Sequence, residues 1–310
     1  MVKLHNKFGL IGHPIAHSLS PALFKAGYDG RYPYELIETA DFEEAYQRFL
    51  DGYDGINVTA PFKELAYAKA DILSEECQAV KATNLLIKTP EGVKAYNSDY
   101  LGVRMWLSEV AESLKKVSEA YKKASSDAVT LASAKLSQKV EATMSPDPND
   151  SERSVCPSGL SRSDWGLTIR PTILIVGLGG AGKAAAAAAE SLGMEVIRMN
   201  RTVRDEQTRP LSDFTTCFRE ADIIIYNIPT AIPELNDLTD SDFNPGKPKF
   251  IMEANYKNPS FDEAFIARMK KANPMAEYTG GRTWLLYQAL TGYRIFTGET
   301  PDLDKMSAVL

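Results

Sequence analysis

Three glycines at a characteristic spacing give the clearest chemical signal in the sequence. Gly177, Gly179 and Gly182 follow the pattern G-x-G-x-x-G, after the apolar run 173–176 and before six consecutive alanines. In this pattern the first glycine permits a tight turn, the second lets the backbone approach a pyrophosphate, and the third lets helix and strand pack closely. The N–H groups at the helix N-terminus favour the same anion. The stretch therefore predicts a dinucleotide site, with a glycine-rich turn that binds nothing as the less favoured alternative.

A second group of polar residues could bind a small molecule and transfer a proton. Asn57 and Thr59 end a predicted strand, where open α/β sheets place their ligands. Lys63 falls in the first turn of the next predicted helix, where the helix dipole disfavours a cation. A functional lysine and an ordinary surface lysine are both open at this point. Ser20 could cap a helix that begins at Pro21 or bind a ligand, whereas Ser18 has no such structural role.

Two further candidates come from later stretches. Asp99 follows a predicted hairpin of residues 85–88 and 93–96, and it precedes a helix expected from Tyr100. Capping of that helix is a strong alternative to a chemical role for Asp99. Gln288 lies in the apolar helix predicted over residues 282–296, which could return to the first half of the chain and place Gln288 beside the other polar residues.

The elements that must position these residues alternate between strand and helix. Asp41 and Glu44 form a capping-box pattern, and Ser212 and Ser260 are expected to begin later helices. We expect strands over residues 7–12, 34–38, 55–58, 173–176, 195–199, 222–227 and 249–254, and helices from residue 20, 41–50, 74–81, 183–192, 212–219 and 260–272. The order predicts a two-domain α/β protein: an N-terminal α/β substrate domain (1–106, with 281–310 returning to it) and a Rossmann-type, doubly wound nucleotide-binding domain (169–280).

Composition narrows the function class. The chain has 310 residues, enough for two cores, and a net charge of −6 that argues against nucleic acid as a partner. No apolar run is long enough for a membrane span, and no leader peptide is evident, so we expect a cytoplasmic protein. Cys77, Cys156 and Cys217 are far apart and show neither a metal spacing nor a disulfide framework.

Residues 107–168 differ in character from the rest. Apolar residues repeat at spacings of four and three, at Val110, Leu114, Val117, Tyr121, Ala124, Ala128 and Leu131. This pattern predicts an inserted helical arm, or a helical hairpin, rather than a long free coiled coil. Residues 143–166 are rich in Ser, Pro, Asp and Arg and are predicted to be a flexible linker.

Several separated motifs together resemble the shikimate dehydrogenase family. They are G-H-P-I-A-H-S-L-S-P over residues 12–21, N-V-T-A-P-F-K over 57–63, Asn84, N-S-D over 97–99, N-R-T over 200–202, Tyr256 with Pro259, and Gln288 with Ala289. The resemblance implies catalytic roles for Lys63 and Asp99. It implies substrate binding by Ser18, Ser20, Thr59, Asn84 and Gln288, and cofactor binding by Gly177, Gly179, Gly180, Gly182, Asn200, Arg201 and Thr202. No metal ion is implied.

The implied activity is the reversible, NADPH-dependent reduction of 3-dehydroshikimate to shikimate by a monomer or homodimer. The residues support NADP: an NAD site typically has an acid at the end of the second strand, whereas Arg201 here offers a planar donor fork for a 2′-phosphate. The sequence departs from the family at Lys81, Thr83, Leu85 and Tyr100, and also at Ile228, Pro229 and Glu253, none of which is assigned to chemistry. The alternatives are an oxidoreductase for quinate or another cyclic polyol acid, with NAD, and a non-catalytic binding relative.

Overall fold

A computed structural model describes residues 6–141, 170–203 and 205–310, with side chains along the long helix described to residue 119. The chain forms two compact units, residues 1–110 with 171–310, and residues 111–170. Residues 143–166, which are predicted to be a linker, lie outside the described residues, and so does Arg204.

The first sheet of the larger unit is mixed and has six strands in the order β2-β1-β3-β5-β6-β4. Strands β2, β1 and β3 are parallel, β5 is antiparallel to both β3 and β6, and β4 is parallel to β6. The predicted hairpin is present as β5 and β6. The strand bounds are β1 Phe8–Gly12, β2 Tyr34–Glu38, β3 Gly55–Val58, β4 Ile72–Leu73, β5 Leu85–Thr89 and β6 Gly92–Tyr96.

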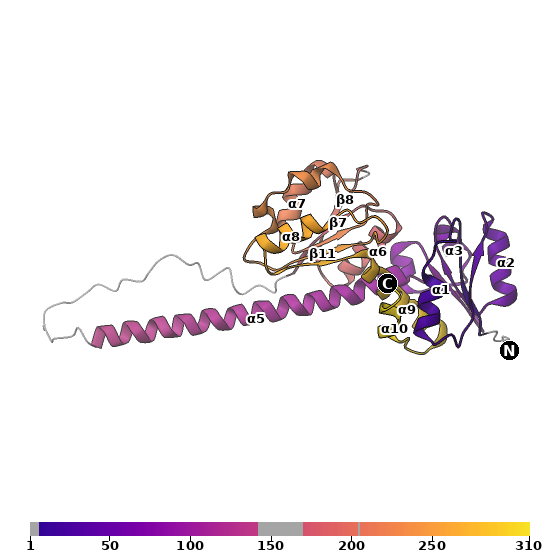
Figure 1. Cartoon of the computed structure of the whole chain (residues 1–310), viewed down its shortest axis with the longest axis horizontal. Coiled ribbons are helices and arrows are strands. Elements are labelled where there is room, and N and C mark those ends of the chain that lie inside the picture. Colours follow the sequence, from indigo (N-terminus) through magenta and orange to yellow (C-terminus); the bar gives the residue numbers. More distant parts are fainter. Residues whose placement is uncertain (1–5, 142–169, 204) are drawn as a thin grey trace. The chain divides into compact units, whose positions relative to one another are not determined.

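Helices cover both faces of this sheet (Figure 1). Because side chains alternate along a strand, Phe8 and Tyr34 face a cluster with α1, whereas Ile11 and Ile37 face a second cluster with α2 and α3. The helices are α1 Ser20–Gly27, α2 Phe42–Gly52, α3 Lys63–Lys69 and α4 Glu75–Val80. Asp41 caps α2 by accepting hydrogen bonds from the N–H groups of Glu43 and Glu44, as predicted, although Glu44 does not return the bond.

The fifth helix, α5 Ser98–Glu141, begins two residues earlier than predicted. Its first turn is capped by Asn97, whose Oδ1 accepts a hydrogen bond from Tyr100 N at 3.0 Å. The capping role considered for Asp99 is therefore wrong, because Asp99 already lies inside the helix. In the described backbone α5 is continuous for 44 residues, so the repeating segment forms one helix and not a hairpin.

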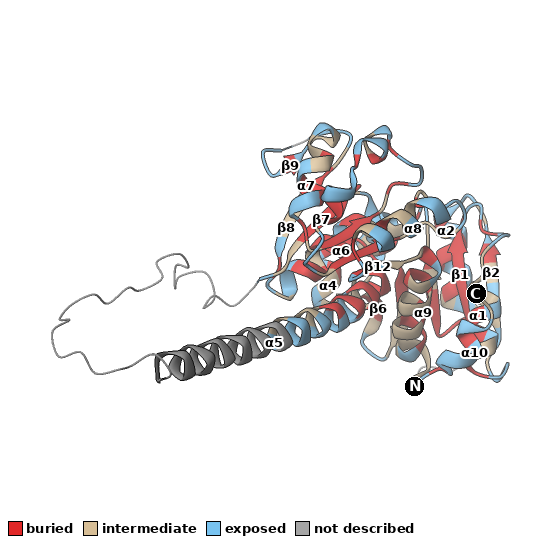
Figure 2. Ribbon diagram, turned by 60° about the vertical axis from the view of Figure 1, so that its left-hand side comes forward, coloured by how far each residue is buried: buried red, intermediate tan, exposed pale blue. Residues whose placement is uncertain are grey.

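The second sheet is fully parallel, with six strands in the order β12-β11-β10-β7-β8-β9. Its strands are β7 Thr172–Val176, β8 Glu195–Met199, β9 Thr208–Arg209, β10 Ile223–Tyr226, β11 Lys249–Glu253 and β12 Ala276–Thr279. The strand order reverses beside β7, which is the doubly wound arrangement expected for this half. Figure 2 shows its central strands as buried, consistent with full burial of Ile173, Ile224 and Ile251.

The helices of this half are α6 Gly180–Ser191, α7 Phe214–Glu220 and α8 Glu263–Ala272, with short 3-10 turns at Leu211–Asp213, Pro233–Asp237 and Asp240–Phe243. Helix α6 starts three residues before the predicted position, directly on the glycine loop. The expectation that Ser260 caps α8 is wrong. Asp262 is the cap, and its carboxylate accepts from Phe265 N at 2.7 Å, because α8 begins at Glu263 and Ser260 lies three residues before it.

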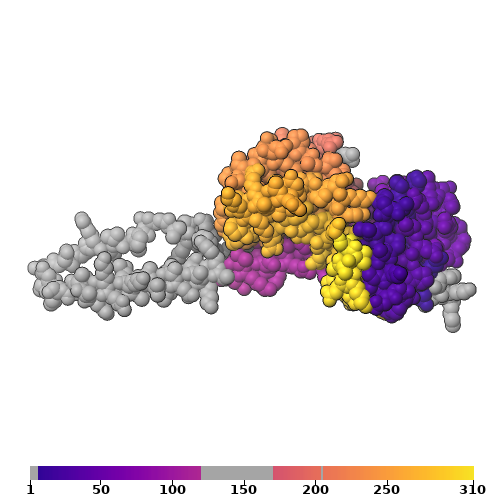
Figure 3. Space-filling view, in the orientation of Figure 1, coloured from indigo at the N-terminus to yellow at the C-terminus, as the bar shows by residue number. Residues whose placement is uncertain are grey.

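The last two helices, α9 Gly281–Thr297 and α10 Leu303–Ser307, pack on the first sheet. A β-carbon added to Gly55 of β3 would lie 2.5 Å from the ring of Phe296, so α9 lies directly on the strands. Figure 3 shows the yellow C-terminal residues against the indigo N-terminal ones. In the part of the chain that the structure describes, no helix combines the length and apolarity that a membrane span needs.

Candidate active site

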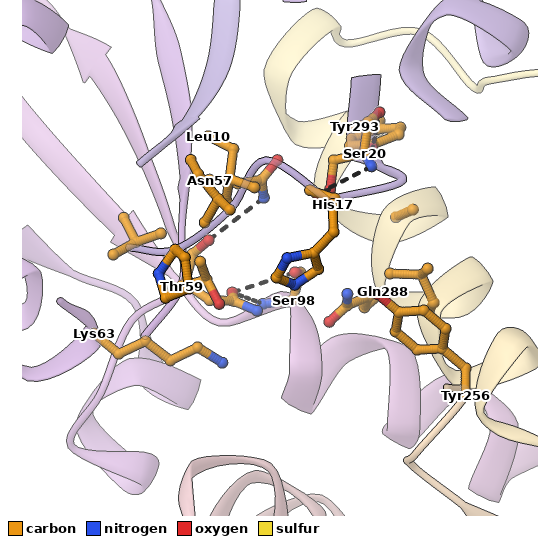
Figure 4. A pocket seen from close by; sticks show the side chains of 17 residues that line it. Leu10, His17, Ser20, Asn57, Thr59, Lys63, Ser98, Tyr256, Gln288 and Tyr293 are labelled. Carbon is orange, nitrogen blue, oxygen red and sulfur yellow. Dashed lines mark hydrogen bonds between the residues drawn. The ribbon is translucent and has the colours of Figure 1, made fainter. Parts of the chain in front are cut away.

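A cavity of about 220 Å³ opens where β1 and β3 end (Figure 4). Six of the residues predicted to bind substrate or act in catalysis line it: Ser18, Ser20, Thr59, Lys63, Asn84 and Gln288. They come from four separate stretches of the chain, which the sheet and helix α9 bring together. Five further polar or aromatic residues that were not assigned to the site also line it: His17, Asn57, Ser98, Tyr256 and Tyr293. Among these, Asn57 was marked by its place at a strand end, and His17, Ser98 and Tyr256 by their places in the motifs that resemble the family. Tyr293 carried no sequence signal.

Ser18 and Ser20 are hydrogen-bonded to each other at one end of the cavity. The Ser18 hydroxyl donates to Ser20 Oγ at 3.1 Å and accepts from Ser20 N at 3.2 Å. The N-cap of α1 is Leu19, and no side chain caps it, so the capping interpretation of Ser20 is wrong. Ser20 is instead the first helical residue, and its hydroxyl oxygen is left to face the cavity.

Lys63 and Asp99 form an ion pair at the other end of the cavity, with Nζ and Oδ2 2.6 Å apart. Lys63 is the first residue of α3, and Asp99 is the second residue of α5. Asp99 is 4% exposed, whereas the Lys63 side chain is 27% exposed. Lys63 therefore lines the cavity, and the buried Asp99 carboxylate fixes the position of its ammonium group. This arrangement can deliver a proton to a ligand oxygen and keep the donor in place.

Asn84 is oriented by the start of α5. Its Oδ1 accepts from Ser98 N at 2.7 Å and from Ser98 Oγ at 3.2 Å, and the residue is 5% exposed. Because the oxygen is occupied, the Asn84 amide nitrogen is the group available to a ligand.

Gln288 reaches the cavity from α9 because two helices make an unusually close contact. A β-carbon added to Gly102 of α5 would lie 2.6 Å from Gln288 N and 2.8 Å from the Tyr287 carbonyl carbon. One turn further along α9, a β-carbon on Gly292 would lie 3.2 Å from Ser98 Cβ. The two glycines therefore set how closely Gln288, Ser98 and Asp99 approach one another.

The glycine loop between β7 and α6 has the geometry that its spacing predicts. Gly177 has a φ of +88°, and a β-carbon on Gly182 would lie 1.8 Å from Gly177 O, so both positions require glycine. A β-carbon on Gly179 would meet no protein atom within 4 Å, which leaves this point of the loop open to a ligand. A β-carbon on Gly180 would lie 4.0 Å from Lys63 Cδ, so the loop is next to the cavity lysine.

Two asparagines flank this loop and fit a bound nucleotide. Asn200 Oδ1 accepts from Leu178 N at 3.3 Å and fixes the loop, and the neighbouring Arg201 and Thr202 are exposed. Asn227, at the end of β10, has both side-chain amide atoms buried without a partner in the described residues. Buried polar groups are normally hydrogen-bonded, so this amide is suited to a ligand group that would complete it.

Two family models match the chain. Residues 10–86 match the shikimate dehydrogenase substrate binding domain. Residues 166–248 match the NAD binding domain of the D-isomer specific 2-hydroxyacid dehydrogenases. The second match supports a dinucleotide-binding fold for this half.

Curated relatives match the N-terminal part. A shikimate dehydrogenase of Thermotoga petrophila is 37% identical over 102 residues, which is 31% of this chain and 38% of that protein. A shikimate dehydrogenase (NADP(+)) of Xanthomonas euvesicatoria is 38% identical over 110 residues, or 34% and 39% of the two chains. The chain thus aligns with less than half the length of these relatives.

Solved structures match over nearly the whole chain. The shikimate 5-dehydrogenase of Thermus thermophilus, in complex with NADP(H) and shikimate, superposes with a TM-score of 0.64 at 22% identity, covering 99% of this chain and 98% of that one. The quinate dehydrogenase of Corynebacterium glutamicum, in complex with NAD, gives a TM-score of 0.66 at 18% identity, covering 98% and 97%. At these identities the likeness establishes the two-domain α/β fold.

Proposed function

We propose that this chain, whose N-terminal domain belongs to the shikimate dehydrogenase family, catalyses the reversible NADPH-dependent reduction of 3-dehydroshikimate to shikimate. The observation that carries the proposal is the Lys63–Asp99 ion pair, which lies on the wall of a small polar cavity and beside the glycine loop. A proton donor and a nucleotide loop in such proximity are what reduction of a carbonyl to an alcohol requires.

The residues of the cavity divide the work between binding and proton transfer. The hydroxyls of Ser18 and Ser20 and the amide of Asn84 are donors suited to the carboxylate and ring hydroxyls of the substrate. When bound, NADPH supplies the hydride. Lys63 then gives its proton to the oxygen on which negative charge develops, and a positioned acid of this kind typically contributes about 10²–10⁴-fold. Asp99 holds the ammonium group in place through the 2.6 Å ion pair.

Each of the three parts of the chain has a separate role in this proposed function. Residues 1–106 with 281–310 bind the substrate, residues 169–280 bind NADP, and residues 107–168 are an inserted segment outside the chemistry. Gly177, Gly179, Gly180, Gly182, Asn200, Arg201 and Thr202 hold the cofactor. We further infer that the binding partner is a small molecule, that the protein is cytoplasmic, and that it acts as a monomer or homodimer.

A second candidate is a quinate dehydrogenase that uses NAD. The similarity of fold to the Corynebacterium glutamicum enzyme and the match to an NAD binding domain favour it. The absence of an acid at residues 200–202, which directly follow β8, argues against it. A non-catalytic binding protein is disfavoured because Lys63 and Asp99 are both present and paired.

The test is a spectrophotometric assay of NADP⁺ and NAD⁺ reduction with shikimate and with quinate. The proposal expects the highest kcat/KM for shikimate with NADP⁺. A preference for quinate with NAD⁺ would select the second candidate, and binding of shikimate without turnover would select the third.

A further inference from the structure

Two tyrosines lie at the cavity, Tyr293 in its lining and Tyr34 behind it, and each donates a hydrogen bond to another residue that lines the cavity. Tyr34 OH donates to Asn57 Oδ1 at 2.8 Å, and Tyr293 OH donates to Ser20 O at 3.0 Å. We propose that Tyr34 and Tyr293 are positioning residues, which orient Asn57 and the Ser18–Ser20 turn for substrate binding. This inference rests on the proposed function for the identity of the substrate, but not for the geometry.

The sheet register places Tyr34 within reach of Asn57. Strand β1 lies between β2 and β3, with Phe8 paired to Tyr34 and Leu10 paired to Asn57. Because Phe8 and Leu10 are two residues apart, they point to the same face, and so do their partners. Tyr34 therefore crosses diagonally over β1 to meet Asn57 on the face that α9 covers.

The hydrogen bonds of Asn57 leave its side chain only one orientation. Its Nδ2 donates to Asn84 O at 3.4 Å. A backbone carbonyl can only accept, so the amide nitrogen must face Asn84, and Oδ1 must face the Tyr34 hydroxyl, which then must donate. The second N–H of Asn57 has no hydrogen bond within the described residues. Tyr34 thereby presents that N–H as a donor at the cavity.

Tyr293 acts in the same way on the opposite wall. It is 2% exposed and extends from α9 to the first helical carbonyl of α1, in the residue that carries the Ser20 hydroxyl. The ring of Phe24 in α1 lies 4.7 Å from the Tyr293 ring, in an edge-on contact, and 4.8 Å from the Tyr34 ring. Both hydroxyls are thus mounted on one aromatic cluster, which limits how far either can move.

Burial keeps both groups in the donating form. It raises the pKa of the Tyr34 hydroxyl well above its ordinary value, and it also raises the pKa of the Tyr293 hydroxyl. Each tyrosine therefore remains a protonated donor across the neutral range. Figure 4 shows Asn57, Ser20 and Tyr293 around the cavity that this pair supports.

Replacement by phenylalanine tests the proposal because it removes only the hydroxyl. Tyr28→Phe is a matched control: Tyr28 belongs to the same aromatic cluster, but its hydroxyl bonds to Glu299 O and Thr297, away from the cavity. We expect Tyr34→Phe and Tyr293→Phe each to raise the KM for 3-dehydroshikimate about five- to tenfold, the worth of one hydrogen bond, with kcat within about twofold. Tyr28→Phe should leave both constants unchanged, and unchanged constants in all three variants would overturn the proposal.

A double-mutant cycle identifies the residue through which Tyr34 acts. In an Asn57→Ala background, Tyr34→Phe should add no further rise in KM, because the group that it orients is gone. Full additivity would contradict the positioning role.

A second measurement separates this proposal from the proposed function. The side-chain amide resonance of Asn57, assigned by its loss in Asn57→Asp, should shift in Tyr34→Phe and stay fixed in Tyr28→Phe. That result is expected even if the wild-type protein does not turn over 3-dehydroshikimate. An unshifted resonance would overturn the positioning role whatever the substrate.

Discussion

Lys63 Nζ and Asp99 Oδ2 lie 2.6 Å apart and join the first turns of α3 and α5, although the two residues are separated by 36 positions in the sequence. The contact depends on Asn97, which caps α5 and so leaves the Asp99 carboxylate for the lysine. Proton transfer is assigned to this pair and ligand binding to the other cavity residues, so effects on kcat and on KM can distinguish the two roles.

Removal of the Lys63 ammonium should lower kcat with little change in KM. We expect Lys63→Ala to reduce kcat about 10²–10⁴-fold, because a positioned acid acts mainly in the transition state. Thr59→Ala and Ser18→Ala should instead raise KM. Lys63→Ala also leaves the buried Asp99 carboxylate without its partner. Lys63→Gln is the control for that effect, because the glutamine amide can still donate a hydrogen bond to Asp99 but cannot supply the proton. Near-native kcat in a folded Lys63→Ala protein would demote Lys63 to a binding residue.

Two glycines of the nucleotide loop should respond differently to the same added methyl group. A β-carbon on Gly182 would collide with Gly177 O, so Gly182→Ala should lower the free energy of unfolding by about 1–3 kcal/mol or more. Gly179→Ala has open space and should retain wild-type stability, yet raise the KM for NADPH. Urea unfolding and steady-state kinetics of both variants give the comparison. Equal stability of the two variants would contradict the packing described for the loop.

Arg201 should distinguish the phosphorylated cofactor. The side chain is exposed beside the loop, where its guanidinium can contact a 2′-phosphate. Arg201→Ala should raise the KM for NADP⁺ by about tenfold or more, as expected for loss of a charge-assisted bond, and should barely alter any use of NAD⁺. Native activity with NAD⁺ that equals or exceeds activity with NADP⁺ would refute this prediction.

Lys249 should make stability depend on pH in the mildly alkaline range. It is 1% exposed, and its Nζ donates to Phe218 O and Ala221 O, both at 2.6 Å. Burial lowers the pKa of Lys249 from 10.5 to about 8 in the folded protein. Between these values the unfolded chain binds more protons, so folded-state stability should rise with pH.

The comparison variant is Lys249→Met, which keeps the length of the side chain and cannot titrate. Between pH 7.5 and 9.5 the wild type should gain about 2 kcal/mol in free energy of unfolding relative to Lys249→Met. Other titrating groups are common to both proteins and cancel. Parallel pH profiles would show that the lysine is not perturbed as described.

The inserted segment should be dispensable for chemistry. No residue assigned to the site lies in it, and the cost of loop closure changes only slowly with loop length. Val110 is 4% exposed and belongs to the larger unit, so a deletion must keep it. A chain that joins Lys116 to Arg170 through a short Gly/Ser linker should keep kcat within about twofold. A folded variant with lost kcat would contradict this, and a change in oligomer size alone would identify the helix as an assembly surface.

Sequence patterns predicted the elements that have a strong hydrophobic periodicity or that are bounded by turn residues. The strands over residues 34–38, 55–58 and 195–199 have the predicted bounds, because each is a short β-favouring run between turn residues. The two-residue strands β4 and β9 are too short to carry a periodic signal. Helix starts were less predictable, since Ser260 and Asp262 are both acceptable caps and the sequence does not distinguish them, whereas in the structure Asp262 caps α8 and Ser260 N donates to Glu253 Oε1.

The same contrast holds within the site. Lys63 and Thr59 could be proposed because motifs and strand ends mark them. Tyr34 and Tyr293 could not, because their contacts join residues 34 with 57 and 20 with 293, and no spacing in the sequence relates such partners. These contacts arise from sheet register and from α9 packing on the strands, which only the folded structure specifies.

The most direct test of the account is the oxidation of NADPH by the purified protein with 3-dehydroshikimate, followed by the loss of NADPH absorbance, for the wild type and for Lys63→Ala in parallel. We predict 3-dehydroshikimate-dependent turnover by the wild type that is lower by about 10²-fold or more in Lys63→Ala, with both proteins folded. No turnover by the wild type, or equal turnover by the two proteins, would contradict the account.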